Sequence, residues 1–248
     1  MKRTVTLTMA VALCFTALLT MAVARTVQAA EPVVPGNPNP PVETIIRTHP
    51  GTDAAFEAQP DDSARHIQSG FVCPASLPNV NLWNFFVFPS PQGIGTDVGC
   101  DYGRMHRTPT GFAAESKFTI FVVKARSGMT LEQVFQGYLA EMHGSAPGGR
   151  VRGPAVSLQK ARLQSADGSN VALPMVLSEA DDFVMAGRQY VSEVVVGLFG
   201  DWIVELRSTY PSEFAPGDPA AGIDFPASSI VWATVMREFA ARAAGSKQ

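Results

Sequence analysis

The most polar stretch of the chain beside apolar residues contains Asp97, Asp101, Tyr102, Arg104 and His106. A histidine beside a carboxylate forms the acid–base pair of many hydrolases, because imidazole exchanges its proton near neutral pH. His106 with Asp97 or Asp101 is therefore the candidate catalytic pair. Arg104 and Tyr102 are the candidate binding residues beside it. The alternative interpretation is a solvated strand end with a surface ion pair, which would contribute little to stability.

The rest of the sequence contains few groups at the spacing of a known catalytic, cofactor-binding or metal-binding motif. The sequence has no Gly-x-Ser-x-Gly, no His-Glu-x-x-His, no phosphate loop and no dinucleotide fingerprint. Its four histidines are spread out, and none pairs with another at the spacing of metal ligands. Asp181-Asp182 precedes a strand-like run and is interpreted as a turn rather than a carboxylate dyad. The sequence thus predicts no metal site and no cofactor, and it favours a protein that is not an enzyme.

The first 29 residues have the features of a signal peptide. Lys2 and Arg3 give a positive start, an apolar run of small residues follows, and small residues end the segment at Ala29. Cleavage is expected after Ala29, with an earlier cut after Ala24 or an uncleaved membrane anchor as the alternatives. The protein is therefore predicted to be periplasmic or secreted, in the envelope of a Gram-negative bacterium, without stable membrane insertion after cleavage.

Removal of this segment leaves a mildly acidic chain. The loss of Lys2, Arg3 and Arg25 lowers the 19 basic residues to 16 against 22 acidic ones, a net charge of −6. No basic run remains, so nucleic acid and anionic membrane surfaces are poor candidates for partners. Another protein of the envelope is the partner that these properties favour.

Two cysteines remain after cleavage, Cys73 and Cys100. An even number of cysteines in an oxidising compartment favours a disulfide. Both lie in strand-like runs, and neighbouring strands can bring two Cα atoms within bridging distance. The rival interpretation, a catalytic or metal-bound thiol, lacks a Cys-x-x-Cys motif. The sequence therefore predicts a structural disulfide.

The elements that would position these residues begin late in the chain. Residues 30–68 are interpreted as a proline-rich, mostly irregular linker, with nothing regular before about Ser69. The single domain is predicted to span 69–244. Within it, a capping box and an apolar stripe of 3.6-residue period predict a helix over 130–143. A cavity between this helix and a sheet is one place where a small ligand would fit.

The second half of the domain is predicted to be mostly strands. Asp167-Gly168 and Gly200-Asp201 each separate two β-prone runs and predict hairpins. An irregular loop over 211–227 then leads into a last helix that ends near Ala244. The fold class is therefore α+β, a mainly antiparallel sheet with two amphipathic helices packed on it.

This order of elements resembles the PsbP-like α/β/α sandwich, which includes the Mog proteins and small envelope proteins of the DcrB type. The resemblance covers roughly Gly70 to Ala244 and rests on element order and on a Gly-x-Thr-Leu helix start at Gly128. It implies a binding or assembly factor without catalytic residues. No site residue carries over, because the chain matches no site motif of the class. The cysteine pair and the loop over 211–227 are not features of that class.

Together these observations predict an exported, non-enzymatic protein that binds another envelope protein or stabilises an assembly. Two alternatives stay open. One is a small exported hydrolase that uses His106 with Asp97 or Asp101, and the other is a module that binds a small ligand.

Overall fold

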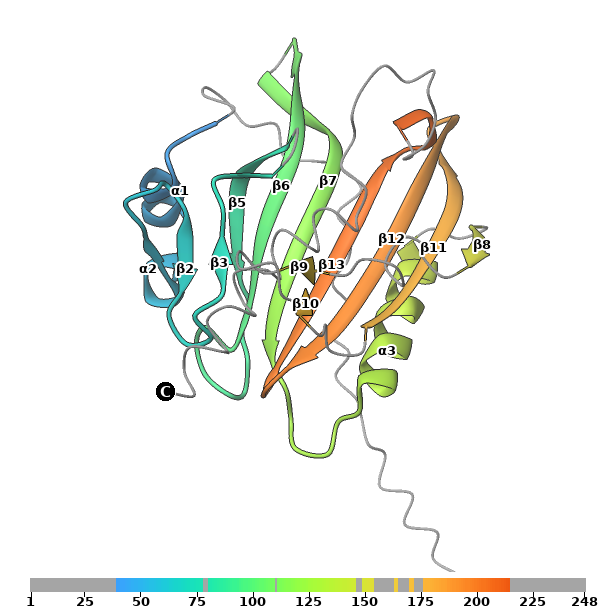
Figure 1. Ribbon diagram of the computed structural model, residues 1–248. Helices are drawn as coiled ribbons and strands as arrows, with labels where there is room; N and C mark the ends of the chain where they lie inside the picture. The colour runs from blue at the N-terminus through green and yellow to red at the C-terminus, as the bar shows by residue number, and fades with distance from the viewer. Residues whose placement is uncertain are drawn as a thin grey trace, which may run out of the picture.

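An antiparallel sheet of eight strands forms the centre of the fold. The computed structural model describes residues 39–77, 80–109, 111–145, 149–153, 163–164, 170–171 and 176–214. Within them the strands run in the order β4-β5-β6-β7-β13-β12-β11-β8 (Figure 1). Their bounds are Ser76–Leu77 (β4), Val80–Val87 (β5), Asp97–Thr108 (β6), Gly111–Lys124 (β7), Arg150–Gly153 (β8), Val176–Met185 (β11), Arg188–Phe199 (β12) and Trp202–Pro211 (β13). The mainly antiparallel α+β architecture predicted from the sequence is confirmed.

The hairpin predicted at Gly200-Asp201 is confirmed in its residue pairing. Phe199 pairs with Trp202 and Val195 with Leu206, so the two strands meet across a two-residue turn. Gly200 has a φ of 62°, a left-handed conformation that glycine adopts without steric cost. The alternation along this hairpin therefore decides which side chains face each side of the sheet.

Other predicted elements are described only in part. Strand β9 (Leu163–Gln164) pairs with β10 (Asn170–Val171), and the turn predicted between them at Asp167-Gly168 lies outside the described residues. A short 3₁₀ turn (Ser212–Phe214) follows β13. The predicted signal segment, most of the loop over 211–227 and the last helix also lie outside the described residues. Among the described residues, no helix has the length and apolar character needed to cross a membrane.

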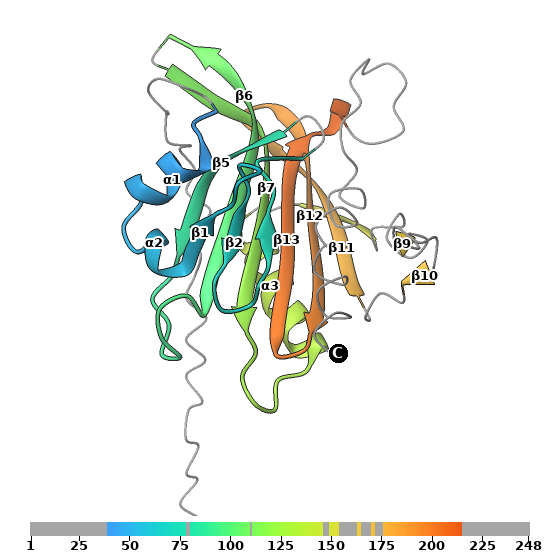
Figure 2. The same ribbon diagram turned by 60° about the vertical axis from the view of Figure 1, so that its left-hand side comes forward.

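A small layer built from the first described residues covers one face of the sheet. It contains two helices and a three-stranded sheet: α1 (Val42–Thr48), α2 (Thr52–Ala55), β1 (Phe56–Ala58), β2 (Ala64–His66) and β3 (Val72–Cys73). Figure 2 shows this layer in front of β5. The expectation of an irregular linker over 30–68, with nothing regular before Ser69, was therefore wrong for residues 42–66.

The apolar spacing of α1 explains why this segment folds. Val42, Ile45 and Ile46 lie at positions i, i+3 and i+4, the spacing of one helix face, and each is at most 6% exposed. The backbone N–H of Val42 donates to Asp62 Oδ1 at 2.9 Å, which satisfies one of the free N–H groups at the helix start. The helix is therefore held by tertiary packing and one cap from the loop before β2, despite the prolines that precede it.

The predicted disulfide is present between Cys73 and Cys100. It joins β3 of the small layer to β6 of the main sheet, and the two Cα atoms are 6.3 Å apart. Both residues are fully buried in the core between the layers. The bridge therefore ties the small layer to the middle of the main sheet.

Helix α3 (Leu131–Ser145) covers the opposite face and confirms the helix predicted over 130–143. The capping box is formed, since Gln133 N–H donates to Thr130 Oγ1 at 3.2 Å and Thr130 N–H to Gln133 Oε1 at 3.1 Å. The apolar stripe of the helix packs on the face of β12 and β13 that carries Val194, Val196 and Ile203. Figure 2 shows α3 behind the sheet, on the side away from β1 and β2.

His66 lies in the core between the small layer and the sheet. Its Nε2 lies 2.8 Å from the carbonyl oxygen of Gly95, so this nitrogen carries the hydrogen and donates it. Nδ1 then accepts from the Ser69 hydroxyl at 2.7 Å. The ring packs edge-on against Trp202 at 5.3 Å between centroids. Burial lowers the pKa of His66 to about 4, and the bond to the Gly95 carbonyl offsets this only in part.

The neutral His66 predicts that stability falls with acid. In the unfolded chain this histidine regains a pKa near 6.5, so the unfolded state binds the proton more tightly than the folded state. The free energy of unfolding therefore keeps its full value with respect to His66 above pH 6.5. As the pH falls from 6.5 towards 4, it decreases by about 3 kcal/mol. Urea unfolding at pH 7, 5.5 and 4 measures this. The variant His66→Gln should lose that part of the pH dependence, and equal pH dependence in both proteins would refute the assignment.

Candidate functional site

The residues that the sequence singled out all lie on β6, but they do not converge. Asp97 pairs with Val123 at one end of the strand, and His106 pairs with Ala113 towards the other end. The two are nine positions apart, about 30 Å at the rise of a β-strand. His106 is exposed. The predicted pair of His106 with Asp97 is therefore not formed.

Asp101 is engaged by other partners. Its side chain is fully buried, its Oδ1 accepts from the Thr119 hydroxyl at 2.6 Å, and its Oδ2 lies 3.2 Å from Lys117 Nζ. His106 stands five residues further along the strand, about 16 Å away. The structure therefore brings His106 to neither carboxylate, and it does not support the hydrolase alternative built on them.

The two predicted binding residues, Tyr102 and Arg104, differ in how far they are buried. Tyr102 is fully buried in the core below the small layer, and its hydroxyl has no hydrogen-bond partner within the described part of the chain. Burial raises the pKa of Tyr102 well above its ordinary value. Arg104 is half-buried and pairs with Ser116 of β7. Tyr102 is therefore a core residue and cannot contact a ligand from solvent, in contrast to the prediction.

A buried ion-pair network lies on the face that α3 covers. The guanidinium of Arg207 pairs with Glu205 on its own strand and with Glu141 of α3, where Nη2 and Oε2 are 2.5 Å apart. It also lies over the rings of Phe121 and Tyr138, at 5.5 and 5.2 Å from their centroids. Burial by itself lowers the pKa of Arg207, but the two carboxylates outweigh it and raise the pKa. This network holds α3 to the sheet.

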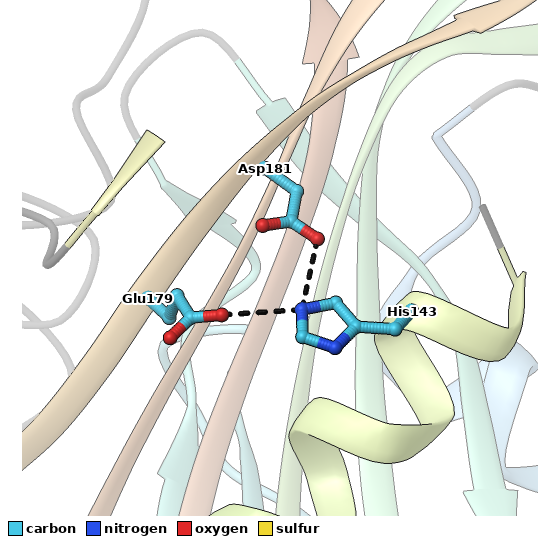
Figure 3. Close-up of side chains that lie close together, drawn as sticks. All are labelled: His143, Glu179 and Asp181. Carbon is cyan, nitrogen blue, oxygen red and sulfur yellow. Dashed lines mark hydrogen bonds and ion pairs between the residues drawn. The ribbon is translucent and has the colours of Figure 1, made fainter. Parts of the chain in front are cut away.

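A second charged cluster lies at the end of α3 and combines His143, Glu179 and Asp181 (Figure 3). His143 Nε2 is 3.1 Å from Glu179 Oε1 and 3.1 Å from Asp181 Oδ2. The ligand atoms of the three side chains all lie within 4.8 Å of one another. One imidazole nitrogen is thus shared between two carboxylates.

The local structure explains why these three meet. Glu179 and Asp181 are two residues apart on β11, so alternation puts both side chains on one face. The stripe of α3 packs on that face through Leu139 and Met142, and His143 follows in the last turn of the helix. Figure 3 shows the imidazole projecting from the helix towards the two carboxylates on β11. The packing of α3 therefore fixes the cluster.

The burial of the cluster is graded from the sheet to the surface. The Asp181 side chain is 1% exposed, that of Glu179 22% and that of His143 43%. Asp181 Oδ1 is buried and accepts no hydrogen bond within the described part of the chain. Desolvating a carboxylate is costly unless a donor or a cation compensates it. The cluster therefore offers a buried anionic oxygen beneath a more exposed histidine.

An aromatic pair on β11 and β12 lies on the same face of the sheet as Glu179 and Asp181. Phe183 and Tyr190 pair across β11 and β12, and their rings stack with centroids 5.7 Å apart. Phe183 is two residues beyond Asp181, so both face the same side of the sheet. Met185, the last residue of β11, also faces this side and is 47% exposed. This end of the β11–β12 hairpin therefore presents apolar side chains next to the charged cluster.

Comparisons with known proteins leave the family open. No protein-family model matches the chain, and no curated protein matches it. One solved structure to which it is similar is PA94 of Pseudomonas aeruginosa, a protein of unknown function described as a putative regulator. The identity is 11%, the TM-score is 0.31, and the similarity covers 71% of this chain and 92% of that one. At this TM-score the similarity says nothing about function, which has to be argued from the site.

The cluster of His143, Glu179 and Asp181, called the His143 cluster below, was not predicted from the sequence. The interpretation of Asp181-Asp182 as a turn was wrong, because both residues lie inside β11. The i, i+2 spacing of Glu179 and Asp181 does indicate that, in a strand, their two carboxylates share one face. Their meeting with His143, however, depends on how α3 packs across the sheet, which no local pattern specifies.

Proposed function

We propose that the protein is an exported, non-enzymatic binding protein of the cell envelope, periplasmic or secreted, that binds a cationic ligand at the His143 cluster. The signal-peptide features of residues 1–29 support export. The buried Cys73–Cys100 disulfide agrees with an oxidising compartment.

The observation that carries the proposal is the buried carboxylate of Asp181. Two carboxylates converge there on one imidazole, which supplies at most one positive charge. Asp181 Oδ1 is left buried and without a hydrogen-bond donor in the described part of the chain. A cation that enters beside the more exposed His143 would compensate both carboxylates. The cluster therefore has the negative charge that a cation site needs, and the exposed His143 gives a cation a route to it from solvent.

The apolar rim supports an envelope protein as the partner that delivers or receives this ligand. This rim consists of the stacked pair of Phe183 and Tyr190 and of Met185, which is 47% exposed and faces the same side of the sheet. Exposed apolar and aromatic side chains that gather in one place are typical of protein-binding surfaces. The carboxylates of the cluster and the apolar rim therefore lie on the same face of the sheet.

Thermal unfolding of the mature protein in the presence of different cations tests the cation site. The series should include divalent metals and organic cations such as spermidine and arginine. At a hundredfold excess over its Kd, a ligand of the folded state stabilises by about 2.7 kcal/mol, or a rise in Tm of at least about 5 °C for a chain of this size. At least one cation should raise the Tm of the natural sequence.

Two variants show whether the effect belongs to this cluster. Asp181→Asn keeps the shape of the side chain but removes its charge, so it should abolish the rise in Tm. Asp201→Asn alters a surface carboxylate that is 66% exposed and should leave the rise unchanged. If no cation raises the Tm, or if Asp181→Asn responds like the natural sequence, the proposed function is wrong.

A further inference from the structure

We infer that the cation bound by the His143 cluster is a divalent transition-metal ion, coordinated by His143 Nε2 and by the carboxylates of Glu179 and Asp181. This inference rests on the proposed function, because it names the ligand of the same site. It has its own support in the spacing of the donor atoms, in their chemical types and in their burial.

The spacing of the donor atoms fits the coordination of one ion. Zinc binds imidazole nitrogen and carboxylate oxygen at about 2.0–2.2 Å, so neighbouring ligand atoms lie about 3.0 Å apart in an octahedral site and about 3.4 Å apart in a tetrahedral one. His143 Nε2 lies 3.1 Å from Glu179 Oε1 and from Asp181 Oδ2. The imidazole nitrogen therefore lies at the spacing of metal ligands from each carboxylate, and the three donor atoms are all within 4.8 Å of one another, so that side-chain rotation can place them around one ion.

The types of donor atom select the class of metal. Ca²⁺ and Mg²⁺ prefer sites made entirely of oxygen, whereas imidazole suits zinc, iron, nickel and copper. The His143 cluster combines one imidazole with two carboxylates, so it favours zinc and its transition-metal neighbours over Ca²⁺ and Mg²⁺. An organic ammonium ion would gain no comparable advantage from the imidazole nitrogen.

Asp181 is a second observation that points to a ligand. Its carboxylate is 1% exposed and directed at the cluster, and Oδ1 has no partner within the described residues. A metal ion beside Asp181 is within reach of either oxygen. The remaining coordination positions face the side where His143 is 43% exposed, so water or a donor atom from a partner completes the shell.

Metal binding at this cluster requires one tautomer of His143. A hydrogen on Nε2 that points at Glu179 or Asp181 occupies the position that the ion would take. The ion therefore binds the neutral tautomer that carries its hydrogen on Nδ1, because this leaves the Nε2 lone pair free for the metal bond.

Isothermal titration of the untagged, mature protein with Zn²⁺ at pH 7 tests the inference. One Zn²⁺ should bind per chain, and Mg²⁺ at the same concentration should not displace it. Co²⁺ used in place of Zn²⁺ should give visible absorption bands, which report coordination by protein ligands directly. His143→Ala should weaken zinc binding by at least about tenfold, and Glu179→Gln should weaken it as well.

The controls separate a metal ligand from a general effect on folding. His49→Ala removes a histidine at the end of α1 and should leave zinc binding unchanged. Glu179→Gln lies at a partly exposed position, so it keeps the test decisive if His143→Ala fails to fold. Zinc binding that survives in both His143→Ala and Glu179→Gln would overturn the inference.

The failures of the two proposals can be told apart. If zinc does not bind but spermidine or arginine stabilises the protein in an Asp181-dependent manner, the metal inference falls and the proposed cation site stands. If neither metals nor organic cations bind, both fall, and His143 is a structural ion-pair partner of Glu179 and Asp181.

Discussion

Replacing Arg207 with methionine should lower the free energy of unfolding by about 3–5 kcal/mol. The guanidinium is the cation beside Glu205, whose side chain is fully buried, and it also reaches Glu141 of α3. Methionine fills a similar volume but leaves both carboxylates without this cation. Removing one partner of a buried ion pair costs far more than the pair itself contributes. Urea unfolding of the two proteins measures the difference.

A double variant shows whether the cost comes from the buried charge. Arg207→Met combined with Glu205→Met should recover most of the loss, because an apolar pair can replace a buried ion pair. Arg207→Lys keeps the positive charge but loses the forked geometry of the guanidinium. Its free energy of unfolding should therefore lie between those of the natural protein and Arg207→Met. A loss below about 1 kcal/mol for Arg207→Met would mean that solvent reaches Glu205 and that the network is not buried.

Removing the disulfide should lower the free energy of unfolding by about 3–4 kcal/mol. The bridge closes a loop between residues 27 positions apart, and it holds the small layer on the main sheet. Without it, the unfolded chain gains the conformational freedom of that loop. The double variant Cys73→Ala/Cys100→Ala measures this by urea unfolding, in comparison with the oxidised natural protein.

The same variant should loosen the small layer more than the rest of the sheet. Amide hydrogen exchange should rise in α1 and in β1 to β3, and much less in β12 and β13, which pair with each other on the far side of β7. Equal stability of the oxidised protein and the double variant would contradict a structural role for the bridge.

Much of the fold could be predicted from the sequence, because its strongest signals are local. Helix α3 begins with a capping box at Thr130 and Gln133, and both hydrogen bonds are present. The turn at Gly200 sets the register of β12 and β13, and alternation then gives the two faces. These elements are specified by residues close together in the sequence, so a local sequence pattern is enough to predict them.

The start of the domain was missed because proline content outweighed a short apolar pattern. Val42, Ile45 and Ile46 have helical spacing, but seven residues are too few for a helix to be stable without tertiary contacts. The packing of α1 over β5 and its cap from Asp62 supply those contacts. Residues distant in sequence decide the structure of this segment.

The candidate site was missed for a related reason. The predicted site residues are neighbours on β6, where alternation sends Asp101 and Tyr102 to opposite faces and strand length separates His106 from Asp97. The His143 cluster joins His143 to Glu179, which lies 36 positions further along the chain, and to Asp181 on the same strand as Glu179. Only the packing of α3 across β11 and β12 brings them together.

Crystals of the untagged mature protein grown with Zn²⁺, with diffraction recorded at the zinc absorption edge, test the central claim most directly. The account predicts one anomalous peak at about 2.0–2.2 Å from His143 Nε2 and from an oxygen of Glu179 and of Asp181. A peak at other residues, or no peak while Asp181 stays hydrogen-bonded to the imidazole, would contradict the assignment of this cluster as a metal-binding site.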